Sequence, residues 1–242
     1  MATRLARKVG ALGCALLFLA LPVALAQPAQ HQDAGSAAPS VESATFHQLV
    51  FANEDFAVLN NLYPPGGDSG FHAHHRDLFA VIIQPARSSI QNLGQEPVAG
   101  PMLPAGGVSY GVISEPRVHR VVNLSDGIYQ IIVVEIRRPT PSGNAISSRV
   151  DAPQYEQIVD NQRMRAWRLV LAPGQSTPSI SQGGSGVRIV VRGGLLTTTT
   201  PGLPDQILAL QAGDFAVQSS GFARALRNTG TETIELVELE LK

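Results

Sequence analysis

Residues 66–83 read GGDSGFHAHHRDLFAVII and combine a glycine-rich turn, three histidines within four positions and an apolar run. The run is typical of a β-strand that starts after a turn, because β-branched and aromatic residues favour strands and glycine favours turns. Similar short runs recur from residue 46 onward with turn residues roughly every ten positions, and no 11-residue window has convincing helical periodicity. The sequence therefore predicts an all-β protein. The runs expected to form strands are FAVLNNLY (56–63), LFAVII (78–83), IYQIIVVEI (128–136), RAWRLVLAP (165–173), GVRIVVRGG (186–194), QILAL (206–210), FAVQS (215–219) and IELVELEL (234–241).

The N-terminus has the three parts of a secretory signal peptide. A basic head (residues 4–8) precedes an apolar run (9–21), and Ala24-Leu25-Ala26 is a cleavage site of the A-x-A type. The apolar run is shorter than the ~20 residues needed to span a bilayer. We therefore expect residues 1–26 to be removed, leaving no membrane span, and the protein to be secreted or periplasmic.

Cysteine content and charge narrow the classes of function. Cys14 is the only cysteine, and it lies in the apolar run of the signal. The remaining chain has no disulfide and no thiolate ligand, so any metal must be held by imidazole and oxygen groups. A net charge of -1 and a charged fraction of 15% argue against nucleic acid as a partner.

An internal repeat divides the rest of the chain into two similar halves. FAVLNNLYPPGG (56–67) is matched by RAWRLVLAPGQ (165–175), and VHRVVNLSDGIYQIIVVEI (118–136) is matched by ARALRNTGTETIELVELEL (223–241). Each half has roughly 90 residues, enough for a small barrel of about eight strands. The predicted organisation is a signal peptide (1–26), a disordered tether (27–45), a first barrel (46–137), a linker (138–153) and a second barrel (154–242).

The histidine stretch resembles a known superfamily. Gly66 followed after five residues by His72-Ala73-His74 is similar to the first motif of the cupins, and His119 followed by Asn123 is similar to the second. The resemblance covers both halves of the chain. It implies two jelly-roll (cupin) barrels in tandem, of which the first is competent to bind a metal.

Strand geometry supports a metal site independently of the family. Residues i and i+2 of a strand face the same side, so His72 and His74 can both point inward while His75 points outward. His119, on a distant strand, would supply a third nitrogen and leave coordination positions open for water or substrate. The expected cofactor is one divalent transition metal (Fe, Mn, Zn, Ni or Cu), and the ligand set does not identify which.

The carboxylate of the cupin motif is missing. The family glutamate would fall at Leu78 or Phe79, and neither side chain can bind a metal. Asp77 is the nearby acid, but it could become a ligand only if a bulge broke the strand alternation. Otherwise the site has three histidines, or takes an acid such as Glu135 from a later strand.

The second half lacks the ligands. The positions of His72, His74 and His119 become Ile180, Gln182 and Arg224, and no histidine occurs beyond His119. A barrel lined in this way is not expected to hold a transition metal. We expect it to complete the core, shield the first barrel or mediate association, so that a homo-oligomer remains open.

Polar residues elsewhere in the first half could contact a ligand. Tyr63, Tyr110 and Gln130 are candidates for contact with a small-molecule ligand or substrate. His47 is expected at the surface, before the first strand.

By resemblance, a mononuclear cupin would act on a small oxygen-rich organic molecule. The chemistry implied is oxidoreductase activity of the dioxygenase kind, decarboxylation, lyase cleavage or isomerisation. The alternatives are a binding module without turnover, or a structural protein of the cell envelope.

Overall fold

The computed structural model describes residues 38–143 and 145–242, so the expected signal peptide and residues 27–37 of the expected tether lie outside the described residues. The described part is built of β-strands and one 3-10 turn, η1 (Val41–Ser43). No helix in this part is long and apolar enough to cross a membrane. The all-β prediction is confirmed.

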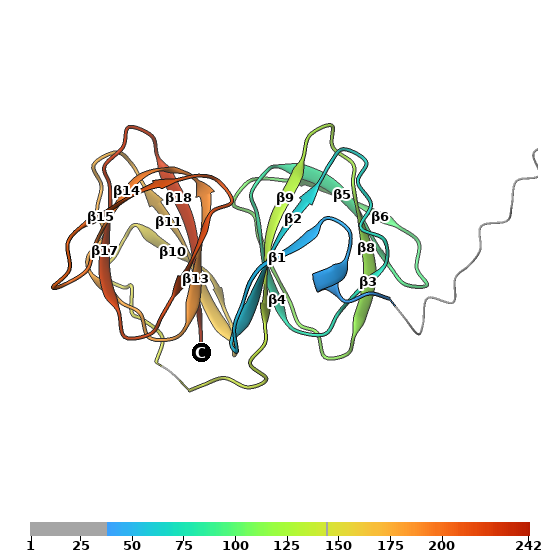
Figure 1. Cartoon of the computed structure of the whole chain (residues 1–242), viewed down its shortest axis with the longest axis horizontal. Coiled ribbons are helices and arrows are strands. Elements are labelled where there is room, and N and C mark those ends of the chain that lie inside the picture. The colour runs from blue at the N-terminus through green and yellow to red at the C-terminus, as the bar shows by residue number, and fades with distance from the viewer. Residues whose placement is uncertain (1–37, 144) are drawn as a thin grey trace, which may run out of the picture. The chain divides into compact units, whose positions relative to one another are not determined.

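The strands of the first half form a five-stranded sheet in the order β1-β2-β9-β4-β7 and a four-stranded sheet in the order β3-β8-β5-β6. The two sheets lie face to face and enclose an interior (Figure 1). The strands are β1 (His47–Ala52), β2 (Phe56–Tyr63), β3 (His72–His74), β4 (Leu78–Ile82), β5 (Ala86–Asn92), β6 (Val98–Leu103), β7 (Val108–Gly111), β8 (Arg117–Asn123) and β9 (Tyr129–Ile136).

The second half repeats this plan with the orders β10-β11-β18-β13-β16 and β12-β17-β14-β15. Each half therefore has nine strands among the described residues, one more than the expected number of about eight. The strands are β10 (Tyr155–Asp160), β11 (Met164–Leu171), β12 (Ile180–Ser181), β13 (Gly186–Arg192), β14 (Gly194–Thr199), β15 (Gln206–Leu210), β16 (Phe215–Gln218), β17 (Ala223–Asn228) and β18 (Ile234–Leu241).

The repeat extends to the hydrogen bonds of one turn in each half. Gly66 and Gly174 both have positive φ, +70° and +80°, which glycine adopts without steric cost. The Gly66 amide donates to the carbonyl of Asn123, and the Gly174 amide donates to that of Asn228. Both asparagine side chains are buried and donate to the backbone carbonyls of two neighbouring turns. The asparagine of the second sequence motif thus satisfies backbone groups that burial has removed from water.

The five-stranded sheets of the two halves pack against each other (Figure 1). Their shared apolar cluster includes Phe56, Val134 and Ile136 from the first half, and Val187 and Leu239 from the second. Strands β9 and β18 are therefore covered on both faces, by their own barrel and by the other half. This explains why their sequences, YQIIVVEI and IELVELEL, are mostly apolar instead of strictly alternating.

The tether was expected to be disordered up to residue 45, and this is wrong for residues 38–45. Val41 is 1% exposed and packs on Leu59, Ala80 and Val133. The Ala73 amide donates to the carbonyl of Pro39 at 2.9 Å, next to the histidines. These residues close the first barrel because Val41 has an apolar pocket to fill, which a composition of small polar residues does not reveal.

The interior of the second half holds Arg149, a residue from the segment between the two sets of strands. Its guanidinium lies 3.8 Å from the ring centroid of Trp167 and 4.4 Å from that of Tyr155. It also donates to Glu238 at 2.6 Å, and Glu238 accepts from Arg188 at 2.6 Å. Although burial acts to raise the pKa of Glu238, the two arginines hold it near 2. The space that a ligand would occupy is therefore filled by the chain's own ion pairs.

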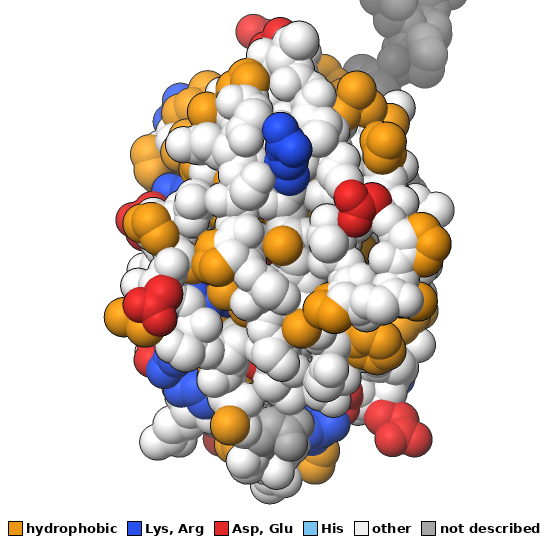
Figure 2. All heavy atoms as spheres, turned by 90° about the vertical axis from the view of Figure 1, so that its left-hand side faces the viewer, with side chains coloured by type: hydrophobic (Ala, Val, Ile, Leu, Met, Phe, Trp, Pro, Cys, Tyr) orange, Lys and Arg blue, Asp and Glu red, His pale blue; other side chains and the backbone are white. Residues whose placement is uncertain are grey.

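The outer face of the second half is mixed in character. In Figure 2 hydrophobic side chains are scattered between polar ones, with charges of both signs. Ile207 and Leu195 of the β14–β15 pair are among the exposed apolar residues. Singly scattered apolar residues are normal on a protein surface and do not mark a docking site.

We predict that Arg149→Ala destabilises the protein through the second half. It removes one partner of Glu238, which is 4% exposed, and breaking a buried pair in this way costs about 3 kcal/mol. Arg192→Ala is the control, because the Arg192 side chain is 62% exposed and its ion pair with Glu235 should contribute less than about 1 kcal/mol. Urea unfolding of both variants measures the difference. Equal losses would contradict the role of Arg149 as a core residue.

Candidate metal centre

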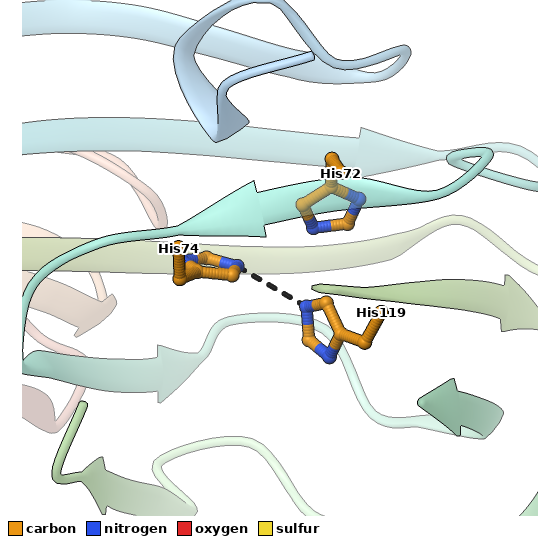
Figure 3. A group of neighbouring side chains, drawn as sticks. All are labelled: His72, His74 and His119. Carbon is orange, nitrogen blue, oxygen red and sulfur yellow. Dashed lines mark hydrogen bonds between the residues drawn. The ribbon is translucent and has the colours of Figure 1, made fainter. Parts of the chain in front are cut away.

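Antiparallel pairing of β3 with β8 brings three histidines together. His72 pairs directly with His119, and His74 lies two residues further along β3 on the same face. All three side chains are buried and point towards one another (Figure 3). One ligand atom from each lies within 4.8 Å of the others, which makes this a group able to hold a metal ion.

The nitrogen geometry fits a single ion. His74 Nε2 and His119 Nε2 are 3.1 Å apart. Two imidazoles on one ion, with metal–nitrogen distances of about 2.1 Å and angles of 90–110°, place their nitrogens roughly 3.0–3.4 Å apart. His72 Nε2 is buried and has no hydrogen-bonding partner among the described residues, while its Nδ1 lies 3.1 Å from the carbonyl of Gly70. Donation from Nδ1 to this carbonyl leaves the Nε2 lone pair free for a metal.

Glu135 orients the second histidine. Its Oε1 lies 3.1 Å from His74 Nδ1, and its side chain is 1% exposed. The only other charged group within 4 Å of this carboxylate in the described chain is Arg76, at 3.8 Å. A carboxylate on the distal nitrogen fixes the tautomer of a ligating histidine and raises its basicity. Glu135 therefore acts behind His74, and is not part of the group that can bind the ion.

The environment keeps two of the histidines neutral. Burial, followed by the neighbouring histidines, lowers the pKa of His72 to about 3 and that of His119 to about 2. Arg117 lowers both further. A neutral imidazole is the form that binds a metal, so the site is ready for one at neutral pH.

Asp77 was considered as a fourth ligand, and the structure places it elsewhere. Its Oδ2 accepts from the Tyr110 hydroxyl and its Oδ1 from the Ile113 amide, both at 2.8 Å. Asp77 lies in the loop between β3 and β4, and these two bonds hold its carboxylate away from the histidines. Among the described residues, the group that can bind an ion consists of histidines alone.

A cavity of about 300 Å³ adjoins the three histidines. Its walls are mostly apolar, with residues such as Leu78, Ile82, Ile131 and Val133 from the five-stranded sheet. Arg117 contributes a guanidinium that donates to Asn92 at 3.0 Å and has no carboxylate partner among the described residues. Cavities of this size accept small organic molecules, and their few polar groups set the orientation of the ligand.

Only one of the three proposed ligand contacts lines this cavity. Tyr63 does. Tyr110 does not, because its hydroxyl is bound to Asp77 on the outer side of the sheet. Gln130 donates to Asn60 at 3.1 Å and lies against Gly213 of the second half, so it also faces outward.

His47 was expected at the surface, and this is wrong. It lines the cavity, its ring centroid is 4.5 Å from that of His72, and its Nε2 lies 3.2 Å from the Tyr63 hydroxyl. Burial lowers its pKa. The sequence signal was weak because His47 is a single histidine 25 positions before His72; its pairing with Asn61 across β1 and β2 is what turns it inward.

The second half keeps the frame of the site without its ligands. Ile180 pairs with Arg224 as His72 pairs with His119. Gln182 donates to the carbonyl of Gly184 at 2.9 Å. Glu240 stands in the register position of Glu135, but it accepts from the backbone amides of Gly183 and Gly184 at 2.7 Å. The same acidic position thus serves a backbone turn in one half and a histidine in the other.

No family model and no curated protein matches the sequence. Solved structures do match. They include AerE from Microcystis aeruginosa (TM-score 0.55, 12% identity, covering 82% of this chain and 98% of that one). Another is YlbA from E. coli, with a TM-score of 0.58 and 13% identity, covering 86% of this chain and 88% of that one. A third is salicylate 1,2-dioxygenase from Pseudaminobacter salicylatoxidans, with a TM-score of 0.53 and 15% identity, covering 77% of this chain and 71% of that one.

Oxalate decarboxylase from Bacillus subtilis, described with Mn(II) centres, matches with a TM-score of 0.55 at 12% identity, over 78% of this chain and 69% of that one. A cupin barrel protein from Leptotrichia buccalis matches with 0.51 at 11% identity, over 81% and 88%. The chain therefore has the cupin fold. Two consecutive halves of the same topology place it with the two-barrel form of that fold.

We predict a pH dependence of stability for the metal-free protein. His72 and His119 have folded pKa values near 3 and 2, below the ordinary 6.5, so below pH 6.5 the unfolded chain binds more protons than the folded one. The free energy of unfolding should then fall as the pH drops from 6.5 towards 4, by up to about 1.4 kcal/mol per pH unit for each histidine. His119→Gln should flatten this slope, and His75→Gln, at an exposed histidine, should leave it unchanged. Identical slopes in all three proteins would refute the prediction.

We also predict that Glu135→Gln weakens metal binding about 10- to 100-fold, because the neutral amide supports the His74 imidazole less well. A Zn²⁺ titration against a chelating dye gives the affinity. Glu156→Gln is the matched control, since the Glu156 side chain is 69% exposed and belongs to the second half. Equal affinities of Glu135→Gln and the wild type would show that Glu135 does not support the site.

Proposed function

We propose that the protein is a mononuclear-metal cupin that acts on a small organic molecule with oxygen donor atoms, in a dioxygenase-like reaction. The observation that carries this proposal is the convergence of three buried imidazoles, two of them held neutral, on the wall of a cavity of about 300 Å³. Such a wall can present one ion directly to a bound molecule.

The ligand count supports catalysis over a structural role. Three protein nitrogens leave coordination positions open, as in catalytic sites, whereas structural sites are closed by four protein ligands. A divalent metal bound there would supply a Lewis acid or an oxygen-activating centre. The imidazole donors suit Fe, Mn, Zn, Ni or Cu alike, and the choice among them is left to experiment.

The chain's own residues have separate parts in this proposal. His72, His74 and His119 hold the ion, and Glu135 fixes the ring of His74. The apolar walls keep water from the bound molecule, and the unpaired Arg117 favours a ligand with negative charge near the histidines.

The fold neighbours are consistent with this chemistry. One variant of salicylate 1,2-dioxygenase was solved with gentisate bound, and oxalate decarboxylase is described with Mn(II). At 12–15% identity these likenesses concern the fold, so the reaction class is our inference. On the sequence of residues 1–26 we also propose that the protein is exported, to the periplasm or the medium.

A second candidate is a ligand-binding cupin without turnover, or a structural protein of the cell envelope. The observation in its favour is that Asp77 is bound to Tyr110 and Ile113, so no carboxylate joins the ion-binding group. A site without an acid carries more positive charge and is less suited to some metal-dependent reactions.

Metal content tests the site. We predict close to one metal ion per chain in the protein reconstituted with Fe²⁺, Mn²⁺ or Zn²⁺, as measured by elemental analysis, and loss of that ion in both His72→Ala and His119→Ala. His75→Ala is the control and should keep the metal, because His75 is exposed and outside the group. A wild type without stoichiometric metal would remove the basis of the proposal.

Measurement of oxygen consumption distinguishes a dioxygenase-like enzyme from a ligand-binding protein without turnover. Metal-loaded protein is assayed with catechols, hydroxybenzoates, diketones and flavonoid-like compounds, with product analysis. Dioxygenase activity predicts uptake of one O₂ per molecule converted, and its loss in His72→Ala. Binding of a compound without any conversion would favour the second candidate.

A further inference from the structure

Asn61 is a buried side chain with an unused hydrogen-bonding group. It is 3% exposed and lines the cavity of the first half. Its Oδ1 has no hydrogen-bonding partner among the described residues. A buried carbonyl without a partner costs free energy, and natural proteins keep few such groups without a functional reason.

The surroundings show that Asn61 does not hold the fold together. Asn123, the buried asparagine of the β8–β9 turn, donates to three backbone carbonyls. The neighbour Asn60, on the opposite face of β2, accepts from Gln130 at 3.1 Å. The second half has Leu169 at the position of Asn61, where it belongs to an apolar cluster. The same frame therefore folds with an apolar residue at this position.

The position of Asn61 in the sheet turns its side chain towards the cavity. It lies between Ile131 of β9 and His47 of β1, both of which also line the cavity. The nearest polar groups on this side are His47 Nε2 and the Tyr63 hydroxyl, which lie 3.2 Å apart and bond to each other, whereas Asn61 Oδ1 has no partner among the described residues. In an apolar site, one well-placed polar group fixes orientation and gives specificity.

We propose that the Asn61 carboxamide accepts a hydrogen bond from a hydroxyl group of the ligand, and so fixes the orientation of a small molecule in the cavity. This rests on the proposed function only in taking the cavity as the ligand site. The class of ligand it implies is a compact, ring-sized molecule with a hydroxyl on the side that faces β2, in addition to the oxygen atoms that would face the histidines. Asn61 is a specificity-determining residue in this account, and no proton transfer is assigned to it.

Phenol and toluene form a probe pair of similar size that differs in the hydroxyl group. Their dissociation constants are measured by ligand-observed NMR on the full-length protein, once as purified and once after treatment with a chelator. Asn61→Leu should lower the preference for phenol over toluene about 3- to 10-fold, the effect of one lost hydrogen bond. The loss should appear in both states, so it remains visible even if the protein binds no metal.

Asn60→Leu is the matched control, since it makes the same change one residue earlier on the outer face. It should leave the phenol preference unchanged and lower the unfolding temperature, because it leaves Gln130 without its acceptor. Asn61→Leu should leave the unfolding temperature unchanged or raise it by a few degrees, as expected when an unpaired buried carbonyl is replaced by an isosteric apolar group.

The proposal is overturned if Asn61→Leu retains the phenol preference of the wild type. It is equally overturned if that variant unfolds several degrees below the wild type, which would mark Asn61 as a structural residue. A wild type that binds no metal, but whose phenol preference still falls in Asn61→Leu, would contradict the proposed metal function and leave this inference standing.

Discussion

The antiparallel pairing of His72 with His119 is the constraint on which the site depends. It brings together residues 47 positions apart and, through the two-residue period of β3, adds His74 to the same inner face. Burial then lowers the pKa of His72 and His119, so both imidazoles are neutral and each has one nitrogen with a lone pair. The Gly66 turn and the Asn123 side chain hold the ends of these strands, and Glu135 sets the ring of His74. Together these contacts fix the positions of the three histidines.

The two halves show how one frame can hold different interiors. In the first half, His72 Nε2 and the side-chain carbonyl of Asn61 are buried without a partner in the described part of the chain, and a cavity lies beside them. In the second half, Arg149 and Arg188 meet Glu238, while Glu240 accepts from backbone amides. Buried polar groups must be satisfied, by the chain itself or by something that binds. The second half pairs the arginines and glutamates of its interior with one another and with backbone amides. The first half leaves His72 Nε2 and Asn61 Oδ1 available for a metal and a ligand.

Much of this could be predicted from the sequence, for physical reasons. Strands β2, β9 and β18 lie in sheets covered on both faces, so their sequences are mostly apolar and their bounds were predicted almost to the residue. The match between the two halves also placed Ile180 and Arg224 at the positions of His72 and His119, and these two residues pair in the structure as the two histidines do. Strand β5, with the sequence ARSSIQN, was missed because it is largely polar.

The predictions that failed concern residues whose positions depend on contacts with residues far away in the sequence. The inward position of His47 follows from its pairing with Asn61, and the ordered residues around Val41 follow from a pocket formed by three strands. Tyr110 and Gln130 were candidates for ligand contact, yet both face outward, where they bond to Asp77 and Asn60. Arg149 lies in a segment without a strand pattern, and its partners Trp167 and Glu238 are visible only once the barrel is closed.

The most direct test of the central claim is an anomalous-difference map from crystals of the protein reconstituted with Mn²⁺ or Zn²⁺. The account predicts one peak, at about 2.1 Å from a ring nitrogen of each of His72, His74 and His119. It predicts no peak beside Ile180, Gln182 and Arg224 in the second half. A map without a peak at the three histidines, or with its peak at Asp77, would contradict the account.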